Sequence, residues 1–400
     1  MAAARKPHVR ELDLVRALTV LGVISVHSTW FTTVGTSYWP SFAMDALHYT
    51  REVFLFLTGF VLFYTYYDRK IALGSWWLRR FKLVGIPYVL WSAGYLIYGG
   101  TLARGIIPYL ATLGPDLVTG TAWFHLYYLI VTMQLYMVFP LFVWLVRKTE
   151  GRHWWLLAAA AVVQVFLMFV AEFDPNLTGI TGPIRYIWDM RGQFFFTYEF
   201  YVILGALAAV HLDTLYRVVV DNARWVILGL VLGLAGMWAF YVVEVGTGAM
   251  TPYGASGVFQ PVMVPYALAV ILTCLVVGVR WAQSETRWPR VSALITLASE
   301  LSFGVYLLHP MILQELSGFG MQFVASWPRI IVTPLMIASV YLITTLIIRG
   351  LAATPVSAYV IGREQIPFDW NGIAERIRNA VPSLRRKPIP PVDVDVNEAH

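Results

Sequence analysis

An arginine and a histidine lie on one apolar stretch near the start of the chain, which reads RALTVLGVISVH over residues 16–27. On an α-helix, the spacing of Arg16 and His27 corresponds to about 16 Å along the axis. Arginine suits phosphate recognition, and histidine suits general-base chemistry near neutral pH. Ionisable groups inside an apolar helix are costly, so they are functional candidates. Taken alone, His27 is equally well explained by a hydrogen bond to a neighbouring helix, and Arg16 by snorkelling.

Six further ionisable residues lie in or at the edge of apolar segments. If the N-terminus is cytoplasmic, all of them fall in the outer half of the membrane with His27: His48, Arg51, Glu52, His125, Glu199 and His309. Histidines with unrelated structural roles are not expected to gather on one side. The sequence therefore predicts one shared site there. The neighbouring Trp123 either stacks on a bound ring or anchors its helix at the membrane interface.

A second group of candidates is basic and falls on the opposite side of the predicted membrane. Arg16 lies there with Asp13 nearby, and the segment WWLRRFK at residues 76–82 adds Arg79, Arg80 and Lys82. Clustered arginine and lysine side chains suit phosphate groups. The same cluster is also explained as a simple topology signal. The two groups together suggest that a phosphorylated donor binds on one side and a histidine acts on an acceptor from the other.

The elements that carry these residues are predicted to be transmembrane helices. The chain has 400 residues, of which 58% are hydrophobic and only 13% are charged, as expected for an integral membrane protein. A span needs about 20 apolar residues. By this criterion the sequence predicts an all-α, polytopic helix bundle with about ten spans: 12–33, 44–67, 83–100, 122–146, 154–172, 194–212, 225–244, 258–279, 291–313 and 330–348.

Charge distribution supports this layout. Most of the 29 basic residues fall in the termini and in alternate loops, which predicts that both termini are cytoplasmic. We expect the first span to be a retained signal anchor. Residues 1–355 are predicted to form one transmembrane domain, and residues 356–400 a cytoplasmic tail that is partly disordered. The net charge of +6 is explained by these loops, so no nucleic-acid partner is expected.

Several common catalytic motifs are absent from the sequence. It contains no HExxH, no CxxC and no aspartate-rich cation loop, so we expect no metal. It also contains no P-loop and no GxSxG elbow, which argues against those nucleotide-binding and hydrolase classes. The single cysteine, Cys274, cannot form an intrachain disulfide.

Five segments occur in an order that resembles the acyltransferase 3 family of membrane-bound O-acyltransferases. They are ELDLVRALTVLGVISVH, REVFLFLTGFVLFY, WWLRRFKLVGIPYVLW, AWFHLYYLIVTMQLYMVFP and SFGVYLLHP. The resemblance covers about residues 8–350. Its most specific element is the basic residue followed by ten positions and a histidine, here Arg16 and His27. The sequence departs from the family pattern at Glu52, Thr58 and Lys82, where aspartate, serine and arginine are more usual.

The resemblance implies acyl-CoA as donor, with acetyl-CoA as the default, and no metal. It implies that Arg16, Arg79, Arg80 and Lys82 hold the phosphates of coenzyme A. His27 would then be the general base, with Glu52 or His309 orienting its imidazole or positioning the acceptor. Residues assigned to the acceptor are His125, Trp123, Arg51 and Glu199.

The resemblance further implies a carbohydrate acceptor on a cell-surface glycan or glycolipid, and a bacterial inner membrane as the location. Two alternatives stay open. One keeps the chemistry but acylates a small molecule, and the other is a transporter or glycan exporter whose histidine and glutamate relay protons. The absence of an internal repeat weighs against transport. The sequence leaves the acyl chain and the oligomeric state open.

Overall fold

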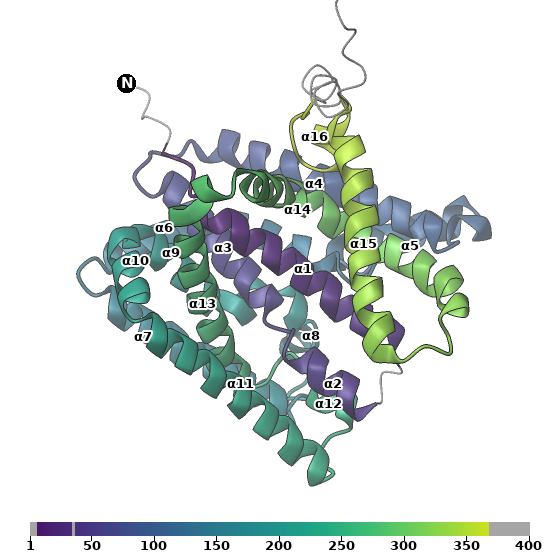
Figure 1. Ribbon diagram of the computed structural model, residues 1–400, viewed down its shortest axis with the longest axis horizontal. Coiled ribbons are helices and arrows are strands. Elements are labelled where there is room, and N and C mark those ends of the chain that lie inside the picture. The colour runs from purple at the N-terminus through teal and green to yellow at the C-terminus, as the bar shows by residue number, and fades with distance from the viewer. Residues whose placement is uncertain (1–5, 34–36, 368–400) are drawn as a thin grey trace, which may run out of the picture.

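The computed structural model describes residues 6–33 and 37–367, and within these ranges the chain is helical without strands (Figure 1). The long helices are α1 (Glu11–Thr32), α3 (Thr50–Tyr66), α4 (Leu73–Tyr98), α5 (Ile106–Thr119), α6 (Tyr127–Lys148), α7 (His153–Phe173), α9 (Glu199–Val210), α11 (Ala223–Gly246), α13 (Met263–Ser284), α14 (Pro289–Glu315) and α15 (Arg329–Ala352). Shorter helices connect them: α2 (Tyr38–Asp45), α8 (Pro183–Asp189), α10 (Leu212–Asp221), α12 (Pro252–Ala255) and α16 (Ser357–Val360).

Eight helices in the described ranges are long and apolar enough to cross a membrane. A ninth span results if Phe195–Val210 and Leu212–Asp221, which meet at 100°, are counted as one broken span. The predicted all-α membrane bundle is therefore confirmed, with one or two spans fewer than ten. One difference lies at predicted span 83–100, which falls in α4 and is not among the eight, and the other at predicted span 194–212, which falls in the broken span. The first turns of α4 carry Arg79, Arg80 and Lys82.

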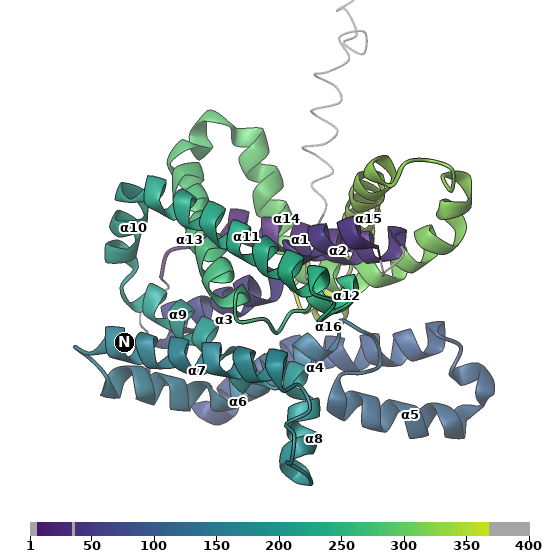
Figure 2. The ribbon, with the colours of Figure 1, turned by 90° about the horizontal axis from the view of Figure 1, so that it is seen from below.

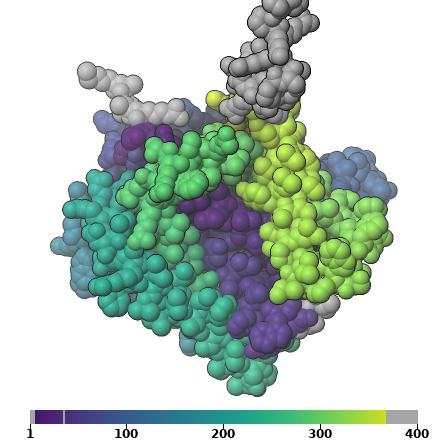
Figure 3. All heavy atoms as spheres, in the orientation of Figure 1, coloured from purple at the N-terminus to yellow at the C-terminus, as the bar shows by residue number. Residues whose placement is uncertain are grey.

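Helix α1 lies at the centre of the bundle. It packs against α3, α13, α14 and α15, and Figure 3 shows it recessed between α13–α14 and α15. Two glycines allow the close approach. A Cβ atom on Gly22 would lie 2.6 Å from Thr50 Cγ2, and one on Gly278 of α13 would lie 2.6 Å from the Glu11 carbonyl oxygen. This packing fixes the start and the middle of the helix that carries Arg16 and His27.

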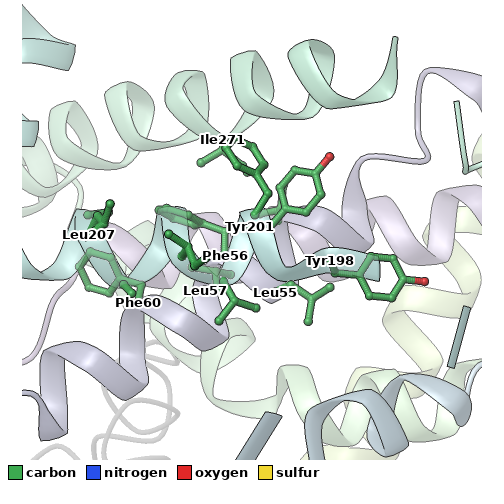
Figure 4. Packing of buried hydrophobic residues seen from close by; sticks show 14 of the residues in the cluster. Leu55, Phe56, Leu57, Phe60, Tyr198, Tyr201, Leu207 and Ile271 are labelled. Atoms are coloured by element: carbon green, nitrogen blue, oxygen red, sulfur yellow. The ribbon is translucent and has the colours of Figure 1, made fainter. Parts of the chain in front are cut away.

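Helices α3 and α9 cross with their backbones in contact. A Cβ atom on Gly59 would lie 2.4 Å from the Val202 carbonyl oxygen, and one on Gly205 would lie 2.1 Å from that of Phe56. Figure 4 shows Phe56 in the apolar cluster beside this crossing. The crossing holds the first turn of α3, which carries Arg51 and Glu52.

The view of Figure 2 shows the bundle along two sides. Helices α4 to α7 lie along one side, and α11, α13, α14 and α15 along the other. Helices α3 and α9 lie between them. The candidate site is therefore built where segments distant in sequence meet around α1.

The first residues of the predicted tail pack on the helices. Arg363 pairs with Glu300 of α14 at 2.7 Å, and Trp91 of α4 donates a hydrogen bond to the Val360 carbonyl at 2.8 Å. Gly362, at a φ of +62°, lies so close to the Leu83 carbonyl that a Cβ atom would approach within 2.3 Å. Residues 356–367 thus belong to the folded body, and 368–400 lie outside the described residues.

Candidate active site

Two cavities lie near the two ends of α1. The histidine cavity, of about 700 Å³, is lined by residues that include Val23, His27, Trp30, His48, Arg51, Phe124, His125, Tyr253, Phe259 and Tyr306. The arginine cavity, of about 810 Å³, is lined by residues that include Lys6, His8, Asp13, Arg16, Tyr64, Arg69 and Arg79. One rigid helix therefore contributes a histidine to one cavity and an arginine to the other.

His27 forms a pair with His309 of α14. Its Nδ1 lies 2.8 Å from Nε2 of His309, and Nδ1 of His309 lies 2.7 Å from the carbonyl oxygen of Tyr306. That carbonyl is available because of Pro310. In a regular helix it would accept from the N–H of residue 310, and proline has no N–H. The sequence YLLHP thus creates its own anchor for the histidine ring.

This chain of hydrogen bonds sets the proton positions in the neutral pair. A carbonyl only accepts, so His309 carries its proton on Nδ1 and presents the lone pair of Nε2. His27 must then donate from Nδ1, which leaves the lone pair of its own Nε2. His27 Nε2 has no hydrogen-bond partner within residues 6–33 and 37–367, and His27 lines the cavity. The arrangement presents a basic nitrogen, as a general base requires.

His125 also lines the histidine cavity. It precedes α6, and its side chain is 2% exposed. The hydroxyl of Tyr306 donates to the His125 backbone carbonyl, which ties this segment to α14. The rings of His125 and His309 lie 5.6 Å apart at an angle of 73°. With His48, which also lines it, the cavity therefore combines the histidine pair with two further imidazoles.

Glu52 and Arg51 pair with each other, so Glu52 does not orient His27. Arg51 Nη2 lies 2.6 Å from Glu52 Oε1, and the guanidinium lies 4.5 Å from the ring of Tyr198 and 5.0 Å from that of Phe259. Arg51 lines the cavity, while the carboxylate of Glu52 is buried behind it. Of the two residues expected to orient His27, His309 is the one in contact with it.

Trp123 and Glu199 lie away from the cavity lining. Trp123 stacks on Tyr95 at 4.9 Å, and Glu199 begins α9 with a half-buried side chain. Tyr306 and Tyr253, which were not among the predicted site residues, also line the cavity. The position of Tyr306 could have been predicted from the sequence, because it precedes the His309–Pro310 pair by one helical turn and so lies on the same face of α14.

The basic candidates divide among three places. Arg16 and Arg79 line the arginine cavity. Arg80 instead donates to the hydroxyl of Tyr66 at 2.9 Å and lies within 6 Å of three aromatic rings, those of Tyr66, Trp76 and Tyr136. Lys82 lies on another surface of α4, beside Leu78 and Phe81. Lys6 and Arg69, which the sequence analysis did not select, join Arg16 at the cavity.

Arg16 is held in place by a short polar network. Its Nη1 lies 3.4 Å from Ser299 Oγ, and that hydroxyl donates to Asp13 Oδ1 at 2.7 Å. His8 contacts the other oxygen of Asp13 at 2.7 Å. In the part of the chain that the structure describes, no group of three His, Cys, Asp or Glu side chains could hold a metal. The cavity thus offers fixed cations suited to an anionic ligand.

The match with known proteins agrees with this geometry. The chain matches the acyltransferase 3 family, described as an acyltransferase domain, over residues 9–349. It belongs to this family, as the sequence resemblance predicts, and it is an integral membrane acyltransferase. It is similar to Acyltransferase MdmB of Streptomyces mycarofaciens, with 25% identity over 307 residues that cover 69% of this chain and 71% of that protein. No solved structure matches the chain.

Proposed function

We propose that the protein transfers an acyl group, with acetyl as the default, from acyl-CoA to a carbohydrate hydroxyl on a glycan or glycolipid. The observation that carries the proposal is the histidine pair at the cavity, on the helix that also brings Arg16 into a cationic cavity. The donor enters from the cytoplasm, and the acceptor from the other side of a bacterial inner membrane. Membership of the acyltransferase family favours this reaction over transport.

The reaction needs one base. The Nε2 lone pair of His27 removes the acceptor hydroxyl proton as the oxygen attacks the thioester carbonyl. The tetrahedral intermediate collapses, the carbon–sulfur bond breaks, and the imidazolium returns the proton to the thiolate to give CoA–SH and the ester. His309 stabilises the charged imidazole through the bond to Nδ1, and such base catalysis contributes roughly 10²–10⁴-fold.

The donor is proposed to span the distance between the cavities. Arg16 and Arg79 hold phosphates of coenzyme A in the arginine cavity, where guanidinium forks match phosphate geometry. The slender pantetheine arm then runs beside α1 for about 16 Å, the axial separation of Arg16 and His27. The thioester reaches His27 by this route. Arg80 and Lys82 lie outside this path, so the proposal gives them no contact with the donor.

The acceptor is proposed to bind among aromatic rings. Trp30 and Tyr253 lie with ring centroids 4.8 Å apart, and both line the histidine cavity. Their side chains are 41% and 51% exposed, which places them near its mouth. Aromatic faces suit an uncharged sugar ring, and so does Arg51, whose charge is paired with that of Glu52. A sugar-bearing small molecule would fit the same lining, so it stays the alternative acceptor.

The test uses the full-length protein in detergent. Acetyl-CoA is titrated by calorimetry against the wild type, Arg16→Ala and His27→Ala, and release of CoA thiol is followed with octyl β-glucoside as acceptor. We expect Arg16→Ala to bind weakly and His27→Ala to bind normally without turnover. Arg224→Ala, which removes an exposed cation stacked on Trp225, is the matched control. Absence of both binding and turnover in the wild type would overturn the proposal.

A further inference from the structure

His125 is a buried imidazole of the histidine cavity whose ring packs against Tyr95, Tyr306 and His309 without a hydrogen bond of normal geometry at either nitrogen. Its side chain is 2% exposed, and neither Nδ1 nor Nε2 has a hydrogen-bond partner among the described residues. A neutral imidazole carries one N–H donor and one acceptor. Leaving both unpaired in a buried place costs free energy, and such groups call for an explanation. Because His125 lines the cavity, a ligand bound there would supply the missing hydrogen-bond partner.

The backbone and ring of His125 are held in place although its ring nitrogens are unpaired. The Tyr306 hydroxyl donates to the His125 carbonyl, and the rings of Tyr95 and Tyr306 lie 5.3 Å and 5.2 Å from the imidazole. The donor is thus fixed before any ligand arrives. Such preorganised donors stabilise developing charge without reorganisation during the reaction.

His125 is close to the reacting base but not hydrogen-bonded to it. His27 uses Nδ1 for His309, and Phe124, next to His125, packs its ring edge-on against His27 at 4.8 Å. His125 therefore neither orients His27 nor takes its proton. In the proposed reaction the thioester carbonyl lies near His27, and the carbonyl oxygen needs a hydrogen-bond donor when the acceptor attacks.

We propose that the ring N–H of His125 donates a hydrogen bond to the thioester carbonyl oxygen as it becomes an oxyanion. This inference rests on the proposed function. When the acceptor oxygen bonds to the carbonyl carbon, the C=O π electrons move to oxygen, and His125 stabilises that charge. They return as the carbon–sulfur bond breaks, and His27 gives its proton to sulfur. The proton of His125 stays on its nitrogen throughout.

The experiment compares His125→Phe, His125→Asn and His125→Gln in the full-length protein, with acetyl-CoA and octyl β-glucoside. His125→Phe fills the volume without a donor, and we expect kcat to fall roughly 10²–10³-fold, as for loss of an oxyanion donor. The affinity for acetyl-CoA should not change, since the arginine cavity lies near the other end of α1, and retained binding also shows that the variant folds. An amide N–H lies near the place of Nδ1 in His125→Asn and of Nε2 in His125→Gln, so one of them should recover about tenfold.

Replacing the thioester carbonyl of the acyl donor by a thiocarbonyl distinguishes stabilisation of the oxyanion from binding of the acceptor. The dithioester analogue of acetyl-CoA offers a sulfur that accepts hydrogen bonds poorly. The wild type should therefore lose more rate with this analogue than His125→Phe does. An unchanged kcat in His125→Phe, a rise in acceptor KM alone, or equal sensitivity to the analogue would overturn the inference while His27→Ala remains inactive. A wild type that releases no more thiol than His27→Ala would overturn the proposed function, and this inference with it.

Discussion

Two histidine pairs in this protein share an Nδ1–Nε2 contact but differ in the angle between their rings, 3° for His27–His309 and 66° for His153–His211, and in their surroundings. His27 and His309 lie 2.8 Å apart through Nδ1 and Nε2. His153 and His211 lie 2.7 Å apart through the same atoms, and His153 Nε2 lies 2.8 Å from the Val146 carbonyl. Both pairs end on a backbone carbonyl outside regular helix bonding. Proline frees it in the first pair, and in the second it lies at the end of α6, where carbonyls lack partners.

The surroundings decide what each pair can do. His27 faces a cavity of about 700 Å³ with two further imidazoles and aromatic walls. His153 begins α7, and His211 lies at the 100° bend between α9 and α10, so the second pair joins three helix ends. Neither of its members lines the histidine or the arginine cavity. A histidine pair by itself therefore fixes a tautomer, and only an adjoining cavity makes it a candidate base.

The largest expected effect comes from removing the base. His27→Ala should lower kcat by roughly 10²–10⁴-fold, because it removes the Nε2 lone pair that takes the acceptor proton. Acetyl-CoA affinity should stay within about threefold, since the arginine cavity is untouched. Release of CoA thiol and calorimetry measure the two quantities. If His153→Ala lowers kcat as much as His27→Ala does, the two histidine pairs do not differ in function as proposed.

A smaller effect is expected from Pro310→Ala. The new N–H at position 310 would compete with His309 Nδ1 for the Tyr306 carbonyl, so His309 would lose its fixed tautomer. A net hydrogen bond is worth about 1 kcal/mol, which corresponds to a loss in kcat of about fivefold to tenfold. Thermal stability should hold or rise, because a helix bond is restored. Unchanged kcat would show that the Tyr306 carbonyl does not set the pair.

The sequence predicts these regions unequally for a physical reason. Membrane spans follow from runs of apolar residues, and depth along a helix follows from its rise, so His27 and His309 could be assigned to one half of the membrane. Their direct contact depends on how α1 and α14 rotate about their axes. That rotation results from packing, for example at Gly22 and Gly278, which no single segment encodes. For this reason the choice between Glu52 and His309 stayed open.

The basic segment of α4 illustrates the same limit. Consecutive residues on a helix point about 100° apart, and here Arg79 lines the arginine cavity while Arg80 donates to Tyr66. Which of them faces the arginine cavity depends on the position of α4 against α6 and on the aromatic rings around Arg80. The residues of the proposed acceptor site are harder still to predict from the sequence. Tyr253 comes from a short helix between spans, and no periodic pattern marks it.

The second histidine pair should affect stability rather than chemistry. His153→Ala removes the hydrogen bonds to Val146 and His211, leaves His211 without this partner while Val146 keeps Thr149, and should lower the free energy of unfolding by about 1–3 kcal/mol. The kcat should stay within about threefold, because the cavity is unchanged. Thermal unfolding and thiol release, both in the same detergent, measure these effects. A large loss of kcat at unchanged stability would contradict the division between the pairs.

The smallest effect is expected from His211→Gln. His153 donates from Nε2 to the Val146 carbonyl, so its Nδ1 accepts and His211 must donate from Nε2. The amide N–H of glutamine can take over this donation, whereas alanine at 153 removes it. Stability should therefore fall by less than about 0.5 kcal/mol, the size of an ordinary tolerated substitution, with kcat unchanged. If His211→Gln destabilises the protein as much as His153→Ala, the imidazole ring itself, and not its donated hydrogen bond, stabilises the bend between α9 and α10.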